Sequence, residues 1–172
     1  YLPDQIFHML PPMLSEVCSL GANDLSNAIS IGFLLNEFEV NDIQIYLSQI
    51  KVIKMSYEEA DKEINSNSTL AALNEIAKVH KAYRDANGAI QLNLPNTDIK
   101  LIDSKVQIFP QTDSESRSLV SEMMILAGRV IAEFSIENSI SMPYLSQEPG
   151  DFSDEVIKNI NKLSPSKAFE AV

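Results

Sequence analysis

A ten-residue run, Leu119-Val-Ser-Glu-Met-Met-Ile-Leu-Ala-Gly128, constrains the fold of this chain more than any other segment. Apolar side chains recur at helical spacing through residues 119–134 and cover most of the helix circumference. A helix of this kind has to bury its apolar surface against other elements. We therefore expect a long, buried central helix that begins at Asp113 or Ser114 and ends near Glu137.

A single acid, Glu122, interrupts the apolar run. It must either face a narrow polar stripe with Ser118, Arg129 and Glu133 or be a semi-buried carboxylate held by a partner, because an unpaired buried charge is costly. Ala127-Gly128 removes side-chain bulk, which would let another backbone or a nucleic acid strand come close. The alternative is a scaffold helix that packs closely on a sheet.

The charge balance of the chain limits the partners that it can hold by ionic contacts. It carries 13 Lys and Arg against 24 Asp and Glu, and the formal net charge of −11 argues against a broad phosphate-binding surface. Residues 1–50 contain no Lys or Arg, whereas eight such residues lie between 51 and 105. We expect any ionic contact with phosphate to come from this middle part. The acidic stretch 113–155 fits a solvated face or the surroundings of a metal site.

Two segments rich in β-branched and aromatic residues predict an antiparallel pair of strands at 27–38 and 43–53. Their connection, 36–42, contains no Gly, so we expect Asn or Asp to take the turn position instead. Earlier in the chain, Pro11-Pro12 predicts short helical turns within residues 3–20 rather than one straight helix.

Helix signals follow the strands. Ser56 and Glu59 form a capping box for a helix at about 57–65, and Ser68 can cap a second helix that stops at Gly88. Further strands are expected at 89–94, 99–102 and 106–109, and a last amphipathic helix is expected after Ser153. Helices and strands in this mixed order predict an α/β (mixed α+β) fold with a largely antiparallel sheet and packed helices.

Signatures of catalysis are absent from the sequence: there is no Gly-rich phosphate loop, no HExxH and no Cys pair suited to zinc. The single cysteine, Cys18, is interpreted as a buried thiol, and His8 and His80 are expected to have structural or surface roles. No apolar span of about 18 residues and no leader are visible, so neither a membrane helix nor a signal peptide is expected.

Five tyrosines are candidates for stacking on unpaired bases, because aromatic side chains beside Lys hold single strands without choosing a sequence. Tyr57 follows Lys51 and Lys54 closely, and apart from Tyr83 no other tyrosine has basic residues nearby. Core packing is the alternative for each of them.

Short motifs in a fixed order resemble the catalytic domain of the ribonuclease II / ribonuclease R family of exoribonucleases. They are Tyr1-Leu-Pro, Met9-Leu-Pro, Cys18-Ser-Leu, Met55-Ser-Tyr-Glu-Glu-Ala, Gly88-Ala-Ile and Leu119-Val-Ser-Glu-Met-Met-Ile-Leu-Ala. The resemblance covers about residues 1–150. The form Val120–Gly128, followed by Met142-Pro-Tyr144 and Gln147, is most similar to the cyanobacterial and plastid branch of the family.

The resemblance implies that residues 1–172 are one partial domain, the central segment of such a catalytic domain. It implies a 3′-to-5′ exoribonuclease that acts on single-stranded RNA, uses Mg²⁺ and releases nucleoside 5′-monophosphates. The compartment that it implies is intracellular, either the bacterial cytoplasm or a plastid. The oligomeric state stays open.

Site residues are implied by the same resemblance. Tyr1 matches a tyrosine that stacks near the 3′ end of the RNA, and Tyr57 matches one that contacts the strand and its sugars. Glu122 matches the second acid of a Glu-Glu pair, whereas Ser121 replaces the first, which is associated with ribose contact. Leu92 stands where the family often has an aromatic clamp residue.

No catalytic residue and no metal ligand are expected within this chain. The family's metal-binding aspartates correspond to positions before Tyr1, and its arginine-bearing motif corresponds to positions after Val172. Hydrolysis of a phosphodiester needs such groups, so we expect this segment to be inactive alone and to supply scaffold and part of the RNA channel. Two alternatives stay open: a catalytically inactive relative that binds RNA or protein, and an unrelated acidic interaction domain.

Overall fold

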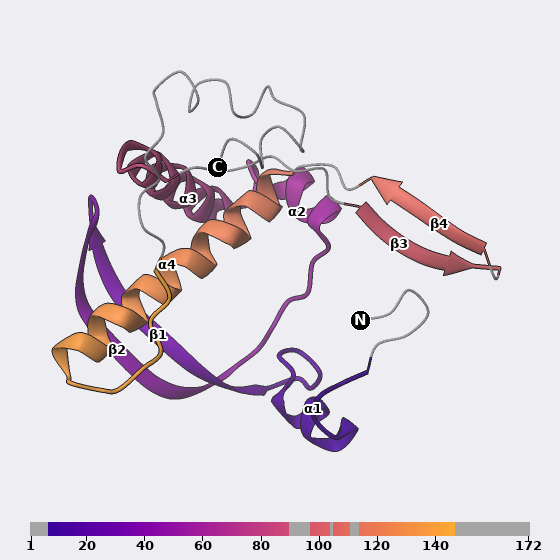
Figure 1. Ribbon diagram of the computed structural model, residues 1–172, viewed down its shortest axis with the longest axis horizontal. Coiled ribbons are helices and arrows are strands. Elements are labelled where there is room, and N and C mark those ends of the chain that lie inside the picture. Colours follow the sequence, from indigo (N-terminus) through magenta and orange to yellow (C-terminus); the bar gives the residue numbers. More distant parts are fainter. Residues whose placement is uncertain (1–6, 90–96, 104, 111–113, 147–172) are drawn as a thin grey trace.

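A computed structural model describes residues 7–89, 97–103, 105–110 and 114–146 of the chain. Within these residues the order of elements is α1 (Pro12–Cys18), β1 (Ser26–Asn36), β2 (Glu39–Ile50), α2 (Tyr57–Glu63), α3 (Ser68–Ala86), β3 (Thr97–Ile102), β4 (Lys105–Pro110) and α4 (Glu115–Glu137). The mixed α/β class with antiparallel strands is confirmed (Figure 1). The strands of the described part form two separate two-stranded sheets, and none of its helices is long and apolar enough to cross a membrane.

The β1–β2 hairpin is the longer of the two sheets. Its strands pair from Ser26 opposite Ile50 to Asn36 opposite Glu39. The turn uses Glu37, whose φ is 53°, so the expectation of Asn or Asp at this place was wrong. Asp42, with a φ of 52°, lies instead where the register shifts. A bulge there lets a residue with a short polar side chain take the left-handed conformation within the strand, and it increases the local bend.

Local capping explains where the next two helices begin. The predicted capping box is confirmed, because the Ser56 backbone N–H donates to Glu59 (2.8 Å) and the Glu59 N–H donates to the Ser56 hydroxyl (3.2 Å). The cap of α3 is Asn67 rather than Ser68, since the Asn67 side-chain oxygen accepts from two backbone N–H groups of the first turn. Gly88, with a φ of 89°, ends this helix as predicted.

Helix α4 begins after Ser114, whose hydroxyl accepts from the Arg117 N–H as expected for a cap. The described residues bury only one of its faces, at Leu119, Leu126 and Val130. Val120, Met124, Ile125 and Ile136 on the other faces are exposed. Burial around the whole circumference therefore does not occur within the described part, because α2, α3 and β2 contact α4 and leave its remaining surface open.

The expectation of a buried thiol was wrong: Cys18 is exposed, because α1 is a short helix without buried residues. A Cβ added at Gly128 would meet nothing within 4 Å, so no described segment comes close to this glycine, and the approach of a nucleic acid strand there stays a prediction.

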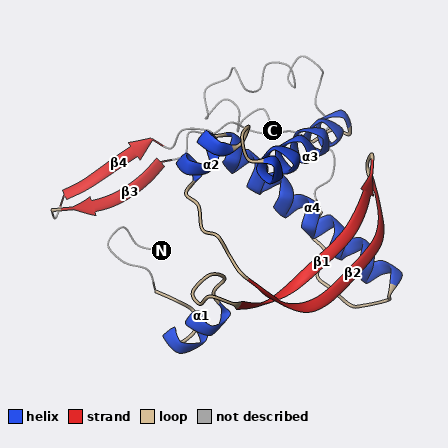
Figure 2. Cartoon of the chain, turned by 180° about the vertical axis from the view of Figure 1, so that it is seen from behind, coloured by secondary structure: helices blue, strands red, loops and turns tan. Residues whose placement is uncertain are grey.

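The core lies where α2, α3 and α4 meet. Ile64, Ala77 and Leu119 are buried there, and Leu70, Leu73 and Met123 pack around them. The tip of the β1–β2 hairpin reaches α3, where Phe38 stacks on Tyr83 with 4.3 Å between the ring centroids. The β3–β4 hairpin extends from the helices on the side away from β1–β2 (Figure 2). The strand expected at 89–94, apart from Ala89, and the helix expected after Ser153 lie outside the described residues.

Replacing Ile64 by Ala should lower the free energy of unfolding by about 2–5 kcal/mol, because a fully buried side chain is truncated and the three helices around it can collapse only partly. Ile64→Val is the matched control and should cost about 0.5–1.5 kcal/mol. Urea denaturation of the protein measures both values. A loss for the alanine variant no larger than that for valine would show that this cluster is not the core.

Candidate functional site

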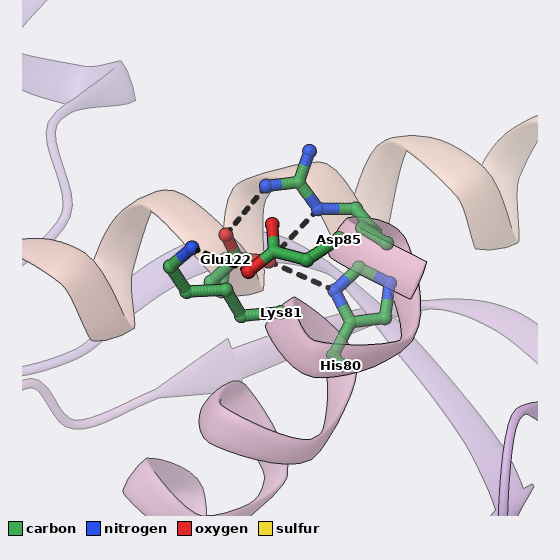
Figure 3. A network of polar contacts seen from close by, with 5 residues as sticks. His80, Lys81, Asp85 and Glu122 are labelled. Carbon is green, nitrogen blue, oxygen red and sulfur yellow. Dashed lines mark hydrogen bonds and ion pairs between the residues drawn. The ribbon is translucent and has the colours of Figure 1, made fainter. Parts of the chain in front are cut away.

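Glu122 on α4 forms a buried cluster with two side chains of α3, Arg84 and His80. The Arg84 guanidinium donates from Nη2 to Oε1 (2.6 Å) and from Nε to Oε2 (3.1 Å). His80 Nδ1 lies 3.0 Å from Oε2 and must be the donor, because an ionised carboxylate only accepts. Figure 3 shows His80 and Glu122 facing each other between the two helices, with the exposed pair Lys81 and Asp85 on the same turn.

The spacing of α3 explains why both side chains reach one carboxylate. His80 and Arg84 are four residues apart and therefore lie on the same helix face. His80 is 4% exposed and Glu122 is 4% exposed, whereas part of the Arg84 side chain reaches solvent. Of the two alternatives for Glu122, the semi-buried acid held by a partner is confirmed, and His80 has the expected structural role.

The electrostatics of the cluster favour the ionised acid. Burial by itself raises the pKa of the Glu122 carboxyl, but the hydrogen bonds from Arg84 and His80 and the charge of Arg84 outweigh it, so this pKa lies below its ordinary value. A carboxylate that is ionised, buried and occupied on both oxygens is a poor proton acceptor. Its chemical capacity is to fix α3 against α4.

A second polar cluster joins the beginnings of α2 and α4. Ser116 donates its backbone N–H to Asp61 Oδ1 (2.9 Å) and its hydroxyl to the Tyr57 carbonyl (3.2 Å). The Ser116 backbone N–H, followed by the Ser116 side chain, holds the pKa of the Asp61 carboxyl below its usual value against the opposing effect of burial. Above them, the Arg117 guanidinium lies over the Tyr57 ring, 4.2 Å from its centroid. This is cation–π geometry.

Two predicted RNA-contact residues belong to one exposed edge, which we define as Tyr57, Arg117 and Ser121. Tyr57 is 37% exposed and Ser121 is exposed, whereas Arg117 between them is half-buried. Arg117 contacts the Tyr57 ring and lies one helical turn before Ser121, so it connects them. Glu122 lies behind this edge in the α3–α4 contact. RNA contact by Tyr57, Ser121 and Glu122 stays a prediction, and Tyr1 and Leu92 lie outside the described residues.

Sequence reasoning missed both arginines of these clusters. Arg84 could have been found, because a lone acid in an apolar helix needs hydrogen-bond donors and α3 offers His80 and Arg84 at a spacing of four. Arg117 left none, since it contacts a ring sixty positions earlier in the chain.

The described residues do not fit a magnesium site. No three His, Cys, Asp or Glu side chains among them come together in a way that could hold a metal ion. Asp61 Oδ1 and both Glu122 oxygens accept hydrogen bonds from protein donors. That Mg²⁺ ligands are supplied from elsewhere stays a prediction.

Glu122→Gln should lower the free energy of unfolding by about 3 kcal/mol, the lower end for breaking a buried pair, because Arg84 keeps some contact with solvent. Glu133→Gln is the matched control on the same helix. Glu133 pairs with Arg129 at the partly exposed i,i+4 spacing, and its loss should cost under about 1 kcal/mol. Equal losses in denaturant titrations of the two variants would contradict a special role for the Glu122 cluster.

The stability contributed by Glu122 should also depend on pH. Its folded-state pKa is depressed below the ordinary value of 4.5, so near and below that pH the unfolded chain binds more protons. The contribution is complete above pH 4.5 and is lost as the pH falls through the folded-state pKa. Unfolding free energies measured from pH 7 downward should therefore fall more steeply for the unaltered protein than for Glu122→Gln. Parallel curves would refute the assignment.

Comparison with known proteins identifies the fold and the family. Residues 1–170 match the RNB domain family. An uncharacterized ribonuclease of Synechocystis sp. is 37% identical over 169 residues, which cover 93% of this chain and 25% of that protein.

Two solved structures share the fold. The Dss1 exoribonuclease active-site mutant of Candida glabrata superposes with a TM-score of 0.75 at 23% identity, covering 98% of this chain and 26% of that one. Mycoplasma genitalium RNase R in complex with ribose-methylated single-stranded RNA superposes with a TM-score of 0.71 at 20% identity, covering 88% and 26%. The resemblance seen in the sequence motifs is confirmed: the chain belongs to the RNB domain family and spans about a quarter of the length of the ribonucleases that it matches.

Proposed function

We propose that this chain is the central segment of the catalytic domain of a 3′-to-5′ exoribonuclease that hydrolyses single-stranded RNA to nucleoside 5′-monophosphates with Mg²⁺. The match of residues 1–170 to the RNB domain family carries the proposal. The Synechocystis relative, named a ribonuclease, and the RNase R bound to single-stranded RNA support the reaction class and the substrate. We place the protein inside the cell, in a bacterial cytoplasm or a plastid.

The role of the segment in this proposal is to hold part of the RNA channel. The Glu122 cluster and the Ser116 contacts fix α4 against α3 and α2, and this leaves Tyr57, Arg117 and Ser121 on one exposed edge. An exposed aromatic ring with a cation beside it is suited to a strand with unpaired bases. Tyr1 and Leu92 complete the proposed set of RNA contacts.

Positioning groups of this kind do not hydrolyse a phosphodiester by themselves. The reaction needs charge neutralisation at the phosphate and an activated water, and bound Mg²⁺ supplies both when its ligands are present. Within the described residues no such ligand group occurs. From the resemblance to the RNB domain family, we propose that the segment is inactive alone and that the metal ligands are supplied from outside it.

The second candidate function is an inactive relative that binds RNA or protein. One observation favours it: the chain is strongly acidic, and such a charge disfavours a broad phosphate-binding surface. Both functions use the same exposed edge, so RNA binding alone does not separate them. Mg²⁺-dependent shortening of RNA does.

The deciding experiment incubates the full-length protein and Mg²⁺ with single-stranded RNA labelled at either end. We expect the 3′ label to appear at once as a nucleoside 5′-monophosphate, while the 5′-labelled RNA shortens progressively. The isolated 172-residue chain, treated in the same way, should leave the RNA intact.

Other products would overturn the proposal in different ways. Immediate release of the 5′ label, or internal fragments as the first products, would refute the 3′-to-5′ direction. RNA binding without any shortening would replace the exoribonuclease by the inactive binding module.

A further inference from the structure

Arg117 differs from the other two arginines of the chain in its partners. Arg84 is paired with Glu122, and Arg129 is paired with Glu133 at 2.7 Å. Among the described residues, Arg117 forms no ion pair, and no acceptor takes a hydrogen bond from its guanidinium. Its guanidinium lies over the Tyr57 ring, and, after the Ser116 hydrogen bonds, its charge contributes to lowering the pKa of the nearby Asp61 carboxyl without an ion pair between them.

The contact with Tyr57 orients Arg117 without using up its donors. A guanidinium held over an aromatic face keeps its N–H groups, which point outward in its own plane, available to an acceptor. The Asp61 carboxylate at the same junction already accepts from the Ser116 N–H. The ring and the partial burial of Arg117 also restrict its rotamers, so binding an acceptor costs it less conformational entropy.

The surroundings favour an anionic acceptor. Arg117 lies in the first turn of α4, next to the capping residue Ser114, where the helix dipole is positive. Ser121, one turn further along α4, offers a hydroxyl on the same edge.

We propose that Arg117 binds a backbone phosphate of single-stranded RNA beside the nucleotide that contacts Tyr57. The inference rests on the proposed function and deepens it by naming a further binding residue of the RNA channel. A phosphate matches the fork of a guanidinium, and a contact to phosphate carries no sequence choice. Arg117 is thus a positioning residue: by holding the phosphate, it fixes which nucleotide of the RNA strand lies at Tyr57.

The test measures RNA affinity of the full-length protein against salt concentration, with a fluorescent single-stranded RNA of mixed sequence and without Mg²⁺. Arg117→Ala should weaken binding about 3- to 10-fold and make the slope of log K against log salt shallower by about 0.7, the value for one lost phosphate contact on a single strand. Arg117→Lys keeps the charge and should restore the slope. Arg129→Ala, on the same helix but paired with Glu133, should change neither quantity.

A double substitution tests the link to Tyr57. Because the ring holds the guanidinium in place, the combined loss in Tyr57→Ala with Arg117→Ala should be smaller than the sum of the two single losses. Additive losses would mean that Arg117 does not depend on the ring and would overturn this part of the proposal.

The outcomes separate this inference from the proposed function. If Arg117→Ala has an unchanged salt slope while the unaltered protein binds RNA and shortens it from the 3′ end, Arg117 only packs on Tyr57 and the inference fails alone. If the unaltered protein neither binds nor shortens RNA, both fail. If Arg117→Ala also melts at a lower temperature than the unaltered protein, the expected change of salt slope, together with its restoration in Arg117→Lys, still supports the phosphate contact.

Discussion

The arrangement of the helices depends on one buried carboxylate. Glu122 stands in an otherwise apolar part of α4, and α3 supplies two donors to it from one face. Such an acid is tolerated only where its partners are in place. The pairing therefore specifies the alignment of α3 against α4 and not only their association. Apolar contacts such as those among Leu119, Ile64 and Ala77 bury surface between the helices but would allow more than one alignment.

The same turn of α3 connects three parts of the molecule. Between His80 and Arg84, which hold α4, lies Tyr83, which stacks on Phe38 at the tip of the β1–β2 hairpin. At the other end of the α4 contact, Ser116 ties the helix to α2. The exposed edge of Tyr57, Arg117 and Ser121 is thus presented by a helix that is held at several points along its length.

Features encoded within a few residues could be predicted from the sequence. The capping box of Ser56 and Glu59, the cap of α4 at Ser114 and the stop at Gly88 all follow from hydrogen bonds or dihedral angles that neighbouring residues determine. Errors occurred where neighbouring residues compete. Asn67 and Ser68 can both cap a helix, and Glu37 takes a turn position for which Asn or Asp was preferred, because the pairing of the strands decides where the turn falls.

By itself, the sequence determined the family, the class of fold, the positions of most elements and the need of Glu122 for a partner, because periodicity, caps and short motifs are local properties. Only the tertiary structure decided which partners those are. The pairing of Glu122 with Arg84 spans 38 positions and that of Arg117 with Tyr57 spans sixty. Contacts of this range depend on how the helices pack, and packing sums many weak, non-directional contacts that no single segment specifies.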